Sequence, residues 1–225
     1  MTSTNRVLRG VGWAAAWLLI TTVVVFVVIR LVNDIPNITA GTLPAESDFD
    51  RRYAENPVLA YLHILPGALY LLGAPFQVSR RFRTASYERH RRVGRVVLSA
   101  GLLTGAMAVV VGLVMPFGGL AEASASTVFG IYFVTALALA YRAIRSGRVS
   151  EHRRWMIRAF ALGVGVGLIR VVIGVGEAGG IGIAESFGAA FWIAFVVMTI
   201  VAEIWLRLRP DPGETPSPLE GIAAT

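Results

Sequence analysis

The sequence contains no cysteine and no lysine. Without cysteine, the chain cannot form disulfides, thiolate metal sites or a cysteine nucleophile. Without lysine, it cannot form a Schiff base, and it lacks the lysine of a phosphate-binding P-loop. All 21 basic residues are therefore arginines. Only 16% of the residues are charged, against about 25% in a typical soluble protein, which argues against a water-soluble domain.

Long apolar runs are abundant instead. Apolar residues make up 55% of the chain, and a helix needs about 20 of them to cross a bilayer. Six segments meet or nearly meet that length, at residues 7–29, 58–78, 93–117, 126–144, 157–176 and 187–206. The sequence therefore predicts an all-α integral membrane protein with six transmembrane helices, surrounded by the lipid bilayer.

The arginines indicate which end of each helix faces the cytoplasm. One set of helix ends and connections holds 17 arginines and the other holds three, with Arg170 inside the fifth segment. Because basic residues are enriched on the cytoplasmic side, this distribution predicts that both termini are cytoplasmic. The same pattern accounts for the net charge of +7, so we do not expect the protein to bind nucleic acid.

The remaining regions complete the predicted organisation. The first segment is too long for a signal peptide, and we interpret it as an uncleaved helix. The acidic connection at 33–57 is predicted to be irregular and to lie outside the cell. Residues 1–209 are expected to form a single transmembrane domain, and proline-rich residues 210–225 a disordered cytoplasmic tail.

An internal repeat relates the second and third segments to the fourth and fifth. A shift of 62 residues gives 12 identities over the 43 positions from 70 to 112, and it aligns His90 and its two following arginines with His152 and its two. The repeated units cover about 58–117 and 126–176. Because two helices separate the copies, both have the same orientation, and segments two to five are predicted to form a pseudo-symmetric four-helix core.

Polar residues inside or next to these spans recur at helical spacing. His63 and Gln77 share one face of the second segment, and Arg170 and Glu177 share one face of the fifth. Ionisable groups within a bilayer avoid lipid, so these faces are predicted to turn towards the bundle interior.

Four short blocks between residues 62 and 170 stand out. They are His63-Ile64 with Gly67; Gly73 with Pro75-Phe76-Gln77; His90-Arg91 with Gly94-Arg95; and His152-Arg153-Arg154-Trp155-Met156 with Arg158. In these blocks, which span half of the chain, the sequence resembles an uncharacterised family of bacterial predicted membrane proteins. The resemblance implies a multi-pass protein of the bacterial plasma membrane, and it implies no established activity.

A weaker similarity is to the four-helix transmembrane b-type cytochromes, in which alternate helices supply histidine pairs to haem. The first functional hypothesis is therefore a b-type haem ligated by His90 and His152, with Arg91 and Arg153 pairing with its propionates. Such a protein would be a membrane oxidoreductase with a redox partner or a quinone. His63 aligns with an alanine in the repeat, so a second haem would lack a ligand.

Two further hypotheses stay open. In one, His63, Gln77, Arg170 and Glu177 surround an outward-facing cavity that binds or transports a small anion or a quinone, because an arginine inside a span needs a partner. In the other, the protein is structural or regulatory and binds no cofactor, and its arginines contact lipid head groups. The glycines of the third and fifth segments fit either close helix packing or room for a flat cofactor. No motif in the sequence names a reaction.

Overall fold

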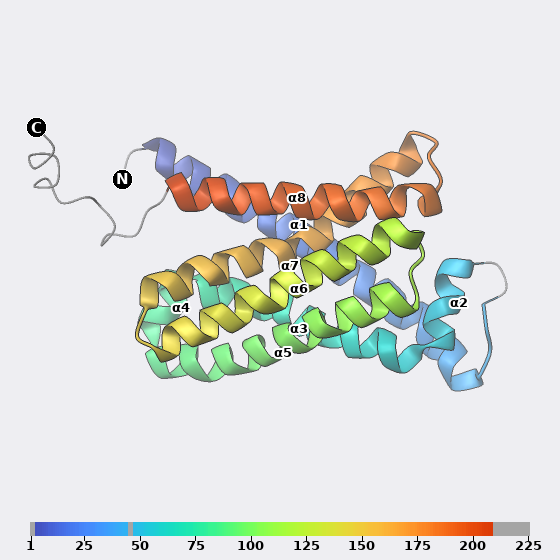
Figure 1. Ribbon diagram of the computed structural model, residues 1–225, viewed down its shortest axis with the longest axis horizontal. Coiled ribbons are helices and arrows are strands. Elements are labelled where there is room, and N and C mark those ends of the chain that lie inside the picture. The colour runs from blue at the N-terminus through green and yellow to red at the C-terminus, as the bar shows by residue number, and fades with distance from the viewer. Residues whose placement is uncertain (1–2, 45–46, 209–225) are drawn as a thin grey trace, which may run out of the picture.

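The computed structural model describes residues 3–44 and 47–208, and this part of the chain consists of helices and short connections (Figure 1). Within it, six helices are long and apolar enough to cross a membrane: α1 (Ser3–Ala40), α3 (Pro57–Val78), α5 (Tyr87–Val114), α6 (Gly119–Arg145), α7 (Val149–Ala178) and α8 (Ile183–Leu208). The short helices α2 (Asp48–Glu55) and α4 (Arg80–Ala85) lie at opposite ends of the bundle. The prediction of an all-α fold with six spans is confirmed for these residues, while the tail at 210–225 lies outside them.

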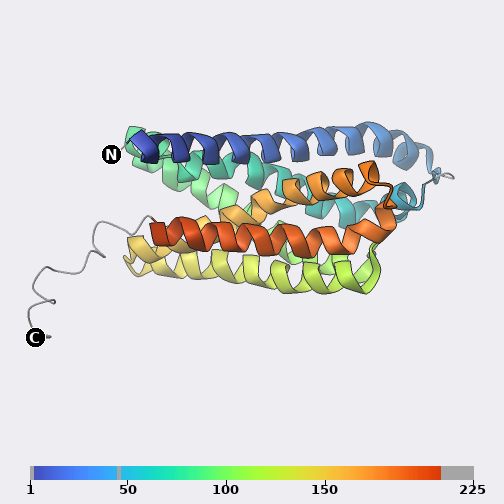
Figure 2. The same ribbon diagram turned by 90° about the horizontal axis from the view of Figure 1, so that it is seen from above.

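Helices α3, α5, α6 and α7 pack as a closed ring, in which α5 contacts α3 and α6, and α7 contacts α6 and α3. Helices α5 and α7 are therefore diagonally opposed. Helix α8 covers α6 and α7, and α1 runs along one side of the bundle against α7 and α3 (Figure 2). Helix α1 begins and α8 ends at the same end of the bundle, as an even number of spans requires.

Three helices begin well before the apolar runs that predict them. Helices α5, α6 and α7 start six, seven and eight residues earlier than the predicted spans at 93–117, 126–144 and 157–176. Ser86 caps α5 by accepting a hydrogen bond from the backbone N–H of Arg89 at 3.2 Å. His90 and His152 consequently lie in the first turns of transmembrane helices, where their positions are fixed by the bundle.

The connection at 33–57 is largely helical, which corrects the prediction that it is irregular. Helix α1 continues through Pro36 to Ala40, and α2 begins at Asp48. Proline removes a backbone donor, but the Asn37 side chain donates to the carbonyl of Asn33 at 2.9 Å and supports this turn of the helix. The Ser47 hydroxyl accepts from the backbone N–H of Asp50 at 3.2 Å and caps α2.

The centre of the ring is filled by the side chain of Tyr70, which packs edge-to-face on Phe133 with ring centroids 5.2 Å apart. A Cβ atom at Gly101 of α5 would lie 2.7 Å from this ring, and one at Gly163 of α7 would lie 2.8 Å from it. Only glycine at both positions allows the tyrosine ring to fit between the two diagonal helices. These are also two of the glycines that the 62-residue shift aligns.

Candidate functional site

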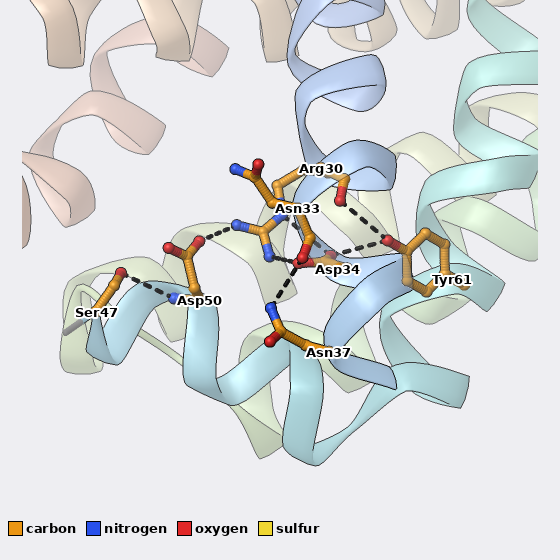
Figure 3. Close-up of polar contacts among 7 residues, drawn as sticks. All are labelled: Arg30, Asn33, Asp34, Asn37, Ser47, Asp50 and Tyr61. Carbon is orange, nitrogen blue, oxygen red and sulfur yellow. Dashed lines mark hydrogen bonds and ion pairs between the residues drawn. The ribbon is translucent and has the colours of Figure 1, made fainter. Parts of the chain in front are cut away.

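The two ends of the bundle are named after the predicted orientation, so the end with α2 is called outer and the end with α4 inner. The outer end contains a buried ion cluster centred on Arg30 of α1 (Figure 3). Arg30 is only 2% exposed, and its guanidinium pairs with Asp34, one turn further along α1, and with Asp50 of α2. Tyr61 of α3 donates its hydroxyl to a carboxylate oxygen of Asp34 at 2.8 Å. One buried arginine thus ties together α1, α2 and α3.

Arg52 of α2 forms a second link, to the connection between α5 and α6. Its Nη1 donates to the carbonyl of Met115 at 2.9 Å and lies 4.0 Å from Oε2 of Glu122. Glu122 is 5% exposed, and the same oxygen accepts hydrogen bonds from the backbone N–H groups of Phe117 and Gly118 at 2.6 and 2.7 Å. The glutamate therefore stabilises the turn before α6 and also holds α2 in place.

Aromatic rings of α2 fill the space between these arginines. The Phe49 ring centroid lies 4.6 Å from the guanidinium carbon of Arg52, and the Tyr53 centroid lies 4.2 Å from that of Arg30. Phe49 also packs against Phe26, Phe117 and Phe187. Burial in this environment lowers the pKa of Arg52, although Tyr53 and Glu122 oppose the effect. Helix α2 thus closes the outer end of the bundle as a cap.

Arg170 of α7 lies deeper in the membrane than this cap. It is eight residues from the end of α7, or about 12 Å at 1.5 Å per residue. Its guanidinium carbon lies 3.7 Å from the ring centroid of Phe26 and 5.9 Å from that of Phe187. Among the described residues, no carboxylate lies within 4.0 Å of this guanidinium, so its close partners there are aromatic faces.

His63 of α3 is held in place by a pair of contacts with Thr104 of α5. Its Nδ1 lies 3.0 Å from the Thr104 carbonyl oxygen, and the Thr104 hydroxyl donates to the His63 carbonyl at 2.8 Å. A carbonyl only accepts, so Nδ1 carries the proton of the neutral ring and Nε2 has a free lone pair. Arg170 acts electrostatically on the His63 ring, and no hydrogen bond or ion pair joins the two side chains within the described residues.

The other two residues predicted for the outer cavity lie elsewhere. Gln77 is at the inner end of α3, 14 residues from His63, which is about 21 Å along the helix. Glu177 is exposed at the outer end of α7. Gln77 and Glu177 lie on the predicted helices. However, Gln77 is not next to His63 on α3, and Glu177 is not next to Arg170 on α7. The predicted four-residue site therefore reduces to His63 and Arg170.

The predicted haem ligands lie at the inner end, on the diagonal helices α5 and α7. His152 Nδ1 lies 2.9 Å from the carbonyl oxygen of Ala140, and His90 stacks on Tyr87. The glycine-lined gap further along these helices is filled by Tyr70, as described above. Two arginines were predicted to pair with the haem propionates. Arg91 is exposed, and Arg153 is half-buried. The haem stays a prediction, which this packing does not favour.

The family model described as "Predicted membrane protein (DUF2306)" matches residues 60–206. The chain belongs to this family. The match begins near the start of α3 and ends in α8, so it includes His63, Arg170 and the two inner histidines. Helices α1 and α2, with Arg30 and Arg52, precede the matched region. No curated protein and no solved structure matches the chain.

Several residues of the outer cluster were not predicted from the sequence as site residues, among them Arg30, Asp34, Asp50 and Glu122. They lie at the edges of the apolar runs, where charged residues are normally solvated. Two signals pointed to them: Arg30 and Asp34 have the four-residue spacing of a helical ion pair, and Ser47 is followed by acidic residues, as is typical of a helix start.

Proposed function

We propose that this member of the DUF2306 family is a binding protein of the membrane that holds a small anion or a quinone head group at Arg170 and His63. One observation carries the proposal. Arg170 is a charged side chain inside a span, and its close partners among the described residues are aromatic rings and not a carboxylate. A charge at such depth costs about 2.5–3.5 kcal/mol on insertion scales, so a bound anion or a polar oxygen would stabilise it.

The chemistry of the two side chains supports this class of ligand. The Arg170 guanidinium offers several parallel N–H donors, which match the oxygens of a carboxylate or a phosphate. The contacts with Thr104 orient the His63 ring, so Nε2 is the nitrogen left to meet a ligand. The rings of Phe26 and Phe187 provide an apolar wall, as is common in small-molecule sites.

Arg170→Gln is expected to weaken binding of such a ligand at least tenfold, which corresponds to about 1.4 kcal/mol. Isothermal titration calorimetry of the purified protein in detergent, with a short-chain carboxylate and a soluble quinone analogue as separate probes, measures this change. Arg142→Gln removes an exposed arginine of α6 and serves as the control with the same charge change. If the wild type binds neither probe and Arg170→Gln changes only the thermal midpoint, the arginine is structural and the proposal is wrong.

The proposed orientation has both termini in the cytoplasm of a bacterial cell and α2 outside, and it rests on the distribution of arginines. The absence of cysteine gives a direct test, because single cysteines can be introduced without background. Thr42 and Ser146 are exposed at opposite ends of the bundle. A membrane-impermeant maleimide should label Thr42→Cys in intact cells and Ser146→Cys only after permeabilisation. The reverse labelling pattern would show that the orientation is opposite to the proposed one.

A further inference from the structure

Two side chains at the inner end of the core have buried nitrogen atoms without hydrogen-bond partners among the described residues. Gln77 of α3 is 7% exposed, and its Nε2 has no acceptor there; the same holds for Nδ1 of His90 on α5. Leaving a buried polar group unpaired costs about 1–3 kcal/mol, so native structures rarely keep one without a ligand or water.

Both side chains are next to the first turns of α5. The Gln77 Oε1 atom would be 3.0 Å from a Cβ atom at Gly94, so the carboxamide lies directly against this glycine. His90 precedes Gly94 by four residues on α5, which puts it one turn away on the same helix face, at about 6 Å. Glycine at position 94 therefore leaves room for the carboxamide against α5, one turn from His90.

The surroundings of His90 are basic. The charged groups that act on its ring are Arg83 of α4 and His152 of α7. The acidic residue nearest in sequence to His90 and the one adjoining His152 are each paired with an arginine. Those pairs are Glu88 with Arg92, and Glu151 with Arg148. The region thus combines N–H donors and positive charge, and both favour the binding of an anion.

We propose that Gln77, His90 and Arg83 form a binding site for a phosphate group at the inner end of the bundle. Helix α4 and the first turn of α5 are where an inner head-group region would lie, and arginine binds phosphate through paired charge-assisted hydrogen bonds. The phosphate belongs either to an anionic phospholipid or to a soluble molecule, and both present the same oxygens to these donors. The site is independent of Arg170 at the opposite end.

Thermal unfolding of the full-length protein tests the site, because a ligand that binds the folded state raises the midpoint. Phosphatidylglycerol is added to nanodiscs of neutral lipid, and inorganic phosphate is added in detergent against chloride at equal ionic strength. At least one of them should raise the midpoint of the wild type. Gln77→Met keeps the side-chain volume but removes the donors, and it should lose most of this shift, as should Arg83→Gln. Arg81→Gln, an exposed change of equal charge on the same helix, should keep it.

The two additions also identify the source of the phosphate. A shift with the lipid alone indicates a membrane ligand, and a shift with inorganic phosphate indicates access from the cytoplasm. The proposal is wrong if neither addition shifts the wild type. It is equally wrong if Arg81→Gln loses as much of the shift as Arg83→Gln, because the effect would then be general attraction between charges. Should Gln77→Met fail to fold, the two arginine variants still decide.

Discussion

Arg30→Met should destabilise the protein by about 3–5 kcal/mol, because it removes one partner of a buried ion pair and leaves the other behind. Asp34 is as deeply buried as Arg30, and without the guanidinium its carboxylate keeps only the hydroxyl of Tyr61 as a hydrogen-bond donor from the cluster. Asp50 also loses its partner, but it is partly exposed and can be solvated. The expected loss is therefore dominated by the stranded charge of Asp34.

A second variant separates this charge effect from a loss of packing. Arg30→Met combined with Asp34→Leu removes both charges and should regain most of the lost stability, since apolar replacement of a buried pair is often neutral. Arg92→Met breaks the exposed pair with Glu88 and should change stability by less than about 1 kcal/mol. Unfolding of the purified protein in mixed micelles measures all three. A double variant as unstable as Arg30→Met alone would contradict the explanation.

Gly167→Ala should separate α1 from α7 and destabilise the bundle by about 1–3 kcal/mol, the usual cost of overpacking. A Cβ atom at position 167 would lie 2.8 Å from the backbone carbonyl carbon of Leu19. The backbone of α1 cannot move aside as a flexible side chain would. Close approach of two helix backbones at glycine is a common way to join helices in a membrane, where lipid offers no hydrophobic drive for association.

Gly174→Ala is the matched control on the same helix. No atom outside its own helix lies within 4 Å of a Cβ at this position, so the extra methyl group meets no obstacle. Alanine is favoured over glycine in helices by about 0.5–1 kcal/mol, and this variant should be neutral or slightly stabilising. Thermal unfolding and the efficiency of crosslinking between α1 and α7 measure both changes. Equal thermal midpoints and equal crosslinking of the two variants would show that the contact at Leu19 does not contribute to the stability of the bundle.

The fold followed from the sequence because a bilayer permits few structures. Apolar runs of about 20 residues predict helices there, and the six expected spans match six long helices in the described residues. The helix ends were harder to predict, since the backbone continues as a helix into the head-group region. Ser86 and Ser47 cap two helices that begin in polar sequence, and hydropathy does not detect such starts.

The candidate site was predictable only in part. Arg170 and His63 stood out because ionisable residues are rare inside spans, and a ligand site formed by both stays a prediction. Gln77 was assigned to the wrong end, because its face of α3 was identified but its depth was not considered. The spacing of Arg30 and Asp34 indicates their ion pair on α1, but the contact with Asp50 depends on how α2 folds back onto the bundle, which the spacing does not indicate.

Helix α1 also has a mechanical consequence. It is a single rod of 38 residues, about 57 Å long, and its outer part is fastened to α2 through Arg30 and Asp50. Its backbone presses on Gly167 of α7 near Leu19, close to the midpoint of the rod. The helix is continuous through this contact, so a single element joins the cap to the opposite end of the bundle.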